Sequence, residues 1–229
     1  MRNTRILAAS MAGLALAGIL AACAPAASEV AEEEPIAQEQ EDETDAEPVD
    51  AADGPATLAE WALPYTTDGE KIATLESDGF RVDVYQVGTV AATKTGSFAT
   101  PDGKPVIAVG DEIVFLNYVV TNTGDEAINL SNLLVEVDAR YDDWPYLQGM
   151  DSVVDSALYE EMGVNYSAYD WKAEEPYVFE PGATFAYGTN FRYEKGSAIS
   201  FTARVVPVLP NGDLDHDNQP EAKGSGVTP

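Results

Sequence analysis

The chain contains a single cysteine, Cys23, and a single histidine, His216. One cysteine excludes an intramolecular disulfide and any cysteine-rich metal site. One histidine excludes HExxH zinc chemistry and the copper or iron centres that need several imidazole ligands. Much metal-dependent chemistry is therefore excluded, and the question that remains is whether Cys23 is reactive, structural or a point of attachment.

Three aspartates alternate in the segment NGDLDHDNQPE near the C-terminus: Asp213, Asp215 and Asp217. This D-x-D-x-D spacing is typical of calcium loops, in which carboxylates converge on one hard cation. The match is partial, because Asn218 stands where such a loop has glycine and Gly224 stands where it has a bidentate glutamate. The pattern favours a polar tail, with a weak calcium site as the alternative.

A second candidate site is an aromatic and acidic region between residues 141 and 177. Its candidate ligand contacts are Tyr141, Trp144, Tyr146, Tyr166, Tyr169 and Trp171. Aromatic faces beside carboxylates suit sugars, cationic groups through cation–π contact, or a protein partner. The alternative is that these rings cover a sheet edge or pack the segment itself, because Tyr and Trp are also common in strands and at core rims.

Motifs of the common enzyme classes are missing from the sequence: it has no G-x-S-x-G elbow, no P-loop and no G-x-G-x-x-G. Carboxylate pairs for glycoside hydrolysis could be drawn from many acids, but the sequence gives neither their separation nor their pKa. We therefore predict a protein that is not an enzyme and needs no cofactor. A carboxylate-based hydrolase of cell-wall glycans is the alternative.

The elements that position these residues follow an export signal. Residues 1–5 carry Arg2 and Arg5 and no acid, and residues 6–20 are apolar apart from Ser10 and two glycines. This apolar run is shorter than the roughly 20 residues that span a bilayer, so it predicts a signal peptide over residues 1–22.

The segment Leu20-Ala21-Ala22-Cys23 resembles the lipobox of bacterial lipoprotein signal peptides. The resemblance implies that the Cys23 thiol receives a diacylglyceryl group and that cleavage makes Cys23 the acylated first residue. Two or more acyl chains hold a protein on a membrane, whereas one is marginal. The expected location is the extracytoplasmic face of the cell membrane, with an ordinary secretion signal as the alternative.

The stretch that follows Cys23 is strongly acidic. Between Ala24 and Pro55 there are twelve acidic residues, no Lys or Arg and no aromatic residue. Such a composition cannot bury enough apolar surface to offset chain entropy, so we predict a disordered acidic linker over residues 23–56. We interpret it as a solvated stalk, with a cation-binding or partner-binding tail as the alternative.

The net charge of −28 argues against binding to nucleic acid, whose phosphates would be repelled, and against electrostatic docking on an anionic membrane. Residues 57–229 hold 28 of the 40 acids and ten of the twelve basic residues, which leaves −18 on the part that is expected to fold. Partners of this part are therefore expected among proteins or glycans of the cell envelope.

From Thr57 onward, aromatic and β-branched residues appear together in short segments. Such segments lie at residues 80–87, 111–122, 133–140, 180–193 and 197–208. Turn signals such as Pro101-Asp102-Gly103 separate them. The pattern predicts an all-β fold, an immunoglobulin-like antiparallel β-sandwich over residues 57–210, and a disordered polar tail over residues 211–229.

Two segments of this region depart from plain alternation. Residues 111–122 are apolar on both faces and predict a central strand. Residues 150–163 have apolar side chains near helical spacing and end in Gly163, so they predict a short helical insertion.

The blocks VGDEIVFLNYVVTNTGDEAINLSNLLVEV (residues 109–137) and YVFEPGATFAYGTNFRY (residues 177–193) resemble the telokin-like, immunoglobulin-fold domains of Gram-positive lipoproteins of unknown function. In that family a long strand leads into an N-T-G-D turn, here at residues 122–125, and a P-G turn opens a later strand, here at Pro181. The resemblance covers roughly residues 80–208 and implies the fold, not an activity. The expected function is binding or interaction by a membrane-anchored lipoprotein, with the glycan hydrolase and a calcium-dependent module as alternatives.

Overall fold

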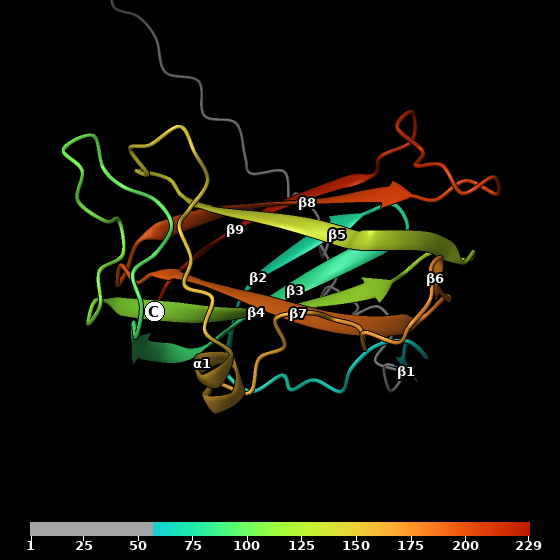
Figure 1. The fold of residues 1–229 in the computed structure, drawn as a ribbon. Coiled ribbons are helices and arrows are strands. Elements are labelled where there is room, and N and C mark those ends of the chain that lie inside the picture. The colour runs from blue at the N-terminus through green and yellow to red at the C-terminus, as the bar shows by residue number, and fades with distance from the viewer. Residues whose placement is uncertain (1–56) are drawn as a thin grey trace, which may run out of the picture. The chain divides into compact units, whose positions relative to one another are not determined.

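The computed structural model describes residues 57–229, which form nine strands and one short helix (Figure 1). In chain order these are β1 (Thr57–Leu58), β2 (Glu70–Ser77), β3 (Phe80–Ala91), β4 (Glu112–Asn122), β5 (Ile128–Tyr141), α1 (Ser156–Glu161), β6 (Tyr177–Phe179), β7 (Ala183–Arg192), β8 (Ala198–Pro207) and β9 (Glu221–Val227). The predicted signal peptide, Cys23 and the acidic linker lie outside the described residues.

All nine strands belong to one sheet, in the order β1-β7-β4-β3-β2-β9-β8-β5-β6. Every neighbouring pair is antiparallel except β1 and β7, which are parallel. The sheet curls, so that β5 and β8 lie across from β4 and β7 (Figure 1). Tyr118 of β4 meets Phe201 of β8 edge-on, with ring centroids 6.5 Å apart. The all-β prediction is confirmed, in the form of one curled, mixed sheet.

Strand β4 is buried on both faces, as its two-sided apolar pattern predicts. Successive side chains of a strand point to opposite faces. Leu116 and Tyr118 therefore join the main core between the two halves of the sheet. Ile113 and Phe115 join a smaller core that also contains Tyr159 of α1. The helical insertion thus covers the outer face of the sheet.

Strand β9, near the C-terminus, corrects one prediction. Residues 221–227 pair with β8 along their whole length and also with β2, so the expected disordered tail over residues 211–229 is wrong for them. Two alternating glycines, Gly224 and Gly226, gave this segment the composition of a linker. In the sheet there is no room for a side chain at Gly226, because a Cβ built there would lie 2.2 Å from the carbonyl oxygen of Ile72. The β domain therefore reaches residue 227.

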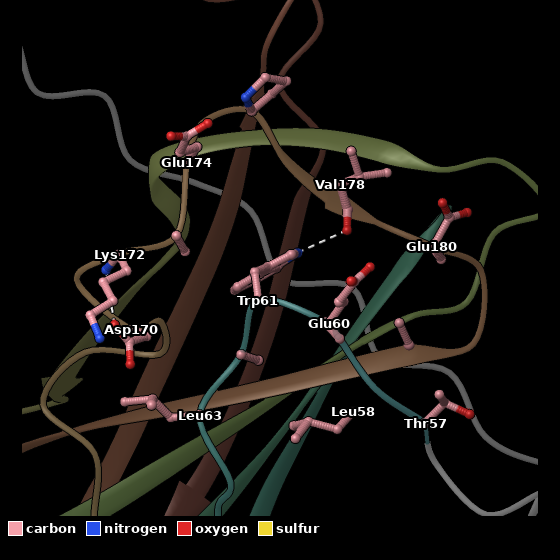
Figure 2. A pocket seen from close by; sticks show the side chains of 15 residues that line it. Thr57, Leu58, Glu60, Trp61, Leu63, Asp170, Lys172, Glu174, Val178 and Glu180 are labelled. Atoms are coloured by element: carbon pink, nitrogen blue, oxygen red, sulfur yellow. Dashed lines mark hydrogen bonds between the residues drawn. The ribbon is translucent and has the colours of Figure 1, made fainter.

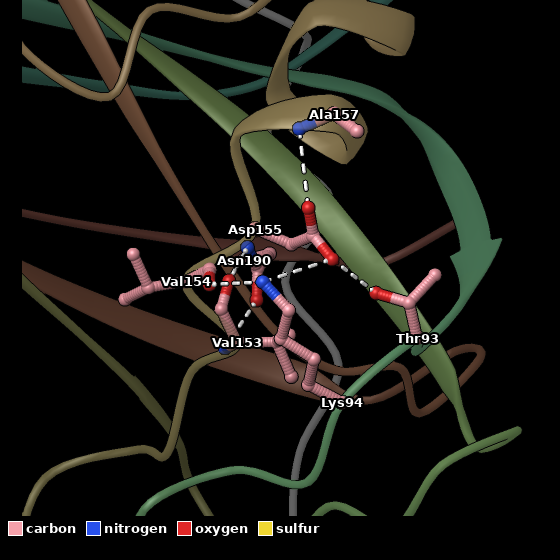
Figure 3. A network of polar contacts seen from close by, with 7 residues as sticks. All are labelled: Thr93, Lys94, Val153, Val154, Asp155, Ala157 and Asn190. Carbon is pink, nitrogen blue, oxygen red and sulfur yellow. Dashed lines mark hydrogen bonds and ion pairs between the residues drawn. The ribbon is translucent and has the colours of Figure 1, made fainter.

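The insertion between β5 and β6 contains α1 and is fixed to the sheet by polar contacts (Figure 3). The Asp155 carboxylate caps α1 by accepting from the backbone N–H of Ala157 at 3.1 Å. The same carboxylate accepts from the Thr93 hydroxyl at 2.6 Å and pairs with Lys94 at 3.3 Å. Hydrogen bonds from Thr93, Ala157 and Lys94 lower the pKa of Asp155. The predicted helix is confirmed over residues 156–161.

The buried amide of Asn190 on β7 makes a two-point connection to the same insertion. Its Nδ2 donates to the Val153 carbonyl at 2.9 Å, and its Oδ1 accepts from the Val153 N–H at 2.9 Å. We expect Asn190→Ala to lower the free energy of unfolding by about 2–4 kcal/mol, because both backbone groups of Val153 lose their partner in a buried place. Urea unfolding of the full chain measures the change.

Asn165→Ala is the matched control for this prediction. The Asn165 side chain makes one exposed hydrogen bond, to the Pro64 carbonyl at 2.9 Å. Its loss should cost about 1 kcal/mol or less. Equal effects of the two substitutions would contradict the role given to Asn190.

Buried tyrosines make the stability of the fold sensitive to alkali. Burial raises the pKa of Tyr141 and of Tyr159 to about 12. In the unfolded chain a tyrosine ionises near pH 10, so this stability is fully present below about pH 10 and is lost as the pH rises toward 12. Between these two pH values, each such tyrosine lowers the free energy of unfolding by up to ~1.4 kcal/mol per pH unit.

Tyr159→Phe should therefore make the loss of stability above pH 10 shallower, which urea midpoints between pH 8 and 11.5 can measure. Phe115→Leu is the control, because Phe115 packs edge-on against Tyr159, with ring centroids 5.0 Å apart, and has no hydroxyl. It should lower stability by the same amount at every pH. A wild-type stability that stays constant from pH 9 to 11.5 would refute the expectation.

Candidate functional site

The two edge strands of the sheet, β1 and β6, border one groove of about 790 Å³. They lie at one end of the domain, opposite the long loops that follow β3 and β5 (Figure 1). Trp61 stands in the middle of the groove and donates from its indole Nε1 to the Val178 carbonyl of β6 at 2.8 Å (Figure 2). The Trp61 side chain thus connects the two edge strands of the sheet, β1 and β6, which are not paired with each other.

Local backbone contacts hold Trp61 in this position. The chain turns directly after β1, since the N–H of Ala62 donates to the Ala59 carbonyl at 2.9 Å. The N–H of Leu63 then donates to the Ala168 carbonyl at 2.7 Å, which ties this turn to the chain ahead of β6. The position of Trp61 is therefore set on both sides by backbone hydrogen bonds.

The Trp61 ring also packs on aromatic residues of β6 and β7. Its centroid lies 5.2 Å from that of Tyr177 and 5.1 Å from that of Phe185. Tyr169 stacks on Tyr177 at 4.7 Å, and burial, followed by the nearby charges of Tyr169 and Glu175, raises the pKa of Tyr177. Trp61, the aromatic residue among those that line the groove, is therefore backed by aromatic rings of β6 and β7.

The rim of the groove is acidic. Four exposed carboxylates and one exposed ammonium group lie among its lining residues, and Figure 2 shows them around Trp61. They are Glu60, Asp170, Glu174, Glu180 and Lys172. The Lys172 Nζ lies 5.2 Å from the ring centroid of the exposed Trp171. An apolar floor with a rim of excess negative charge suits a ligand that is both apolar and cationic.

The structure separates the six aromatic residues that the sequence groups into one site. The prediction that Tyr141 contacts a ligand is wrong: this side chain is 1% exposed, packs on Phe191 and donates to the Arg192 carbonyl. Tyr166 is exposed and meets Tyr159 edge-on. Tyr169 stacks on Tyr177, which packs on Trp61, and the exposed Trp171 lies in the sequence between Asp170 and Lys172, which both line the groove. Only the last two belong near the groove.

Trp144 and Tyr146 lie in the loop between β5 and α1. Their rings meet edge-on, with centroids 5.2 Å apart, and both line a smaller hollow of about 310 Å³. Asp143, Arg192 and Glu194 also border this hollow. Both residues pack against buried apolar side chains at the base of the loops.

The three aspartates of the C-terminal segment do not form a common site. The Asp215 carboxylate accepts from the backbone N–H groups of Asp217 and Asn218, each at 3.1 Å. Asp213 accepts from the Asn211 side chain at 2.8 Å. Within residues 57–229, no three His, Cys, Asp or Glu side chains are grouped so as to hold a metal ion. Calcium binding by Asp213, Asp215 and Asp217 stays an untested alternative.

Trp61 is the residue that sequence reasoning missed. It lies in the segment LAEWALP, directly after the acidic linker, where no periodic pattern marks a strand. A lone tryptophan at the start of a folded part is a weak signal, because its partners lie more than 100 residues further along the chain; the Trp61–Val178 bond spans 117 positions.

Comparisons with known proteins give little. No protein-family model matches the sequence, and no curated protein matches it. Among solved structures, YcdA of Bacillus subtilis, a candidate lipoprotein, overlaps with a TM-score of 0.34 and 12% identity over 66% of this chain. This chain spans 38% of the length of that protein, and so slight a likeness carries no argument. The telokin-like resemblance stays a prediction.

Helices of membrane-spanning length and hydropathy are not found among residues 57–229.

Proposed function

We propose that this protein is an extracytoplasmic lipoprotein, anchored through Cys23, whose β domain binds a component of the cell envelope in the groove between β1 and β6. The groove around Trp61 is the observation that carries the proposal. The lipobox-like segment ending at Cys23 supports the anchor. The immunoglobulin-like sandwich is kept as the proposed description of the curled sheet, since Tyr118 and Phe201, from its two opposed halves, pack edge-on against each other.

Binding without catalysis is proposed because of how the groove is built. Ligand sites are typically concave and mostly apolar, with volumes of roughly 300–1,000 Å³ and a few polar groups, and this groove is of that kind. The general acid of a glycosidase usually sits in a partly desolvated pocket, whereas the four carboxylates of this rim are exposed. Their arrangement supports attraction of a ligand more than proton transfer.

Co-sedimentation tests this proposal. The full chain, purified in detergent, is mixed with its own cell-wall sacculi or with detergent-dispersed envelope proteins coupled to beads. The wild type should bind one of the two preparations in a saturable manner. Charge reversal at the rim, in the double variant Glu60→Lys and Glu174→Lys, should reduce binding several-fold, because both residues line the groove and are exposed.

The matched control reverses two exposed acids on α1, in the double variant Glu160→Lys and Glu161→Lys. It changes the net charge by the same amount outside the groove and should bind like the wild type. Trp61→Phe keeps an aromatic ring but removes the indole N–H that reaches Val178, and it should also weaken binding. Equal binding by all four proteins would show that the groove is not the site.

The hydrolase and the calcium-dependent module stay alternatives. Release of reducing ends from cell-wall fragments, lost on single Asp or Glu substitution, would overturn the binding-only proposal. A calcium-induced rise of the melting temperature, lost on Asp215→Asn, would support the module.

A further inference from the structure

We propose, on the basis of the proposed function, that the groove takes an extended, basic segment of a partner protein, which adds as a strand along the free side of β1. Three features of the groove lead to this occupant: its charge, its free strand edge and its apolar floor.

The charge of the rim selects a cationic partner. The residues that line the groove include four acids and only one basic residue, Lys172. The acids are Glu60, Asp170, Glu174 and Glu180. The chain's own linker leads directly to Thr57, but it brings twelve acids and no Lys or Arg, so like charges oppose its entry. A neutral glycan would gain no attraction from the excess negative charge.

The edge of β1 offers backbone groups to an added strand. β1 pairs with β7 on one side, and among residues 57–229 no strand covers its other side. An uncovered edge presents N–H and C=O groups that another extended chain can pair with. The opposite edge is less open, because the Val178 carbonyl of β6 already accepts from Trp61 at 2.8 Å.

The floor of the groove suits long basic side chains. Because β1 has only two residues, its edge can supply few hydrogen bonds, and side-chain contacts must supply the rest. In an added strand, alternate side chains point to the same face. Lysine or arginine at these positions would lay an apolar stem on Leu58 and Trp61 and bring the charged head to the acidic rim.

Titration calorimetry with the full chain in detergent tests the proposal. The probe is a blocked hexapeptide of alternating lysine and valine. The comparison ligands are the same peptide methylated on alternate backbone nitrogens, an alternating glutamate and valine peptide, spermine, and a soluble chitin oligosaccharide. We expect one-to-one binding of the lysine peptide that weakens at high salt, because the rim charges are exposed.

Loss of the backbone donors in the methylated peptide should weaken binding at least tenfold, and so should Glu60→Lys with Glu174→Lys. The α1 control, Glu160→Lys with Glu161→Lys, should stay within about twofold of the wild type, since exposed charges outside the contact contribute little. Unchanged melting temperatures of both double variants exclude unfolding as the cause.

Equal affinity for the two lysine peptides and for spermine would overturn strand addition and leave a site for polycations. Preference for the oligosaccharide, or for the acidic peptide, would overturn the basic partner altogether. No binding of any lysine peptide overturns the proposal as well. If rim-dependent binding to envelope material persists in that last case, the proposed function stands and only the peptide inference fails.

Discussion

Deletion of residues 221–229 is expected to abolish the cooperative unfolding transition of the β domain. β9 lies inside the sheet between β2 and β8, so its loss leaves two unpaired edges in the middle of the strand order. It also removes Ala222 and Thr228, which are buried. The free energy of unfolding of a typical domain is only about 5–15 kcal/mol, and losing an internal strand should cost more than this. Circular dichroism and urea titration would reveal it.

A disordered tail would behave differently, because its removal would leave the transition unchanged. Gly226→Ala gives a milder test of the same point. The new Cβ would lie 2.2 Å from the Ile72 carbonyl oxygen, and this overpacking should cost about 1–3 kcal/mol. Gly149→Ala is the control, because no atom lies within 4 Å of a Cβ built there. Similar stabilities of the two variants would count against an internal β9.

Cys23→Ser should prevent lipid attachment and so release the protein from membranes, or leave it unprocessed with its signal peptide. A serine hydroxyl lacks the thiolate chemistry by which a cysteine is acylated. Membrane fractionation, with mass spectrometry of the N-terminal peptide, measures both outcomes. Residues 57–229 contain no cysteine, so the fold of the β domain should be unchanged.

Ala26→Ser serves as the control for Cys23→Ser. It introduces the same hydroxyl three positions later, outside the lipobox-like segment, and should leave acylation and membrane retention intact. Wild-type processing and membrane retention in Cys23→Ser would show that the anchor assignment is wrong.

Each of the five strands that the sequence pattern predicts is present in the structure, because alternation is a local property; they are β3, β4, β5, β7 and β8. The pattern does not predict β1, β2, β6 or β9. Residues 111–122 are apolar on both faces, and β4 is buried on both faces. The segment ahead of Gly163 has helical spacing, and α1 lies there. Composition misled at residues 221–227, where strand pairing depends on a close approach of the backbone that only the neighbouring strands impose.

The sequence by itself determined the all-β class, the short helical insertion and the strong negative charge, since these follow from composition and local patterns. Only the tertiary structure decided where the sheet edges meet. Trp61 and Val178 are 117 positions apart, and their hydrogen bond joins two residues that line the groove. Burial of Tyr141 and the dispersal of the other aromatic residues were decided in the same way. A binding site assembled from distant segments depends on how strands pair across the whole chain, and local sequence patterns do not predict that pairing.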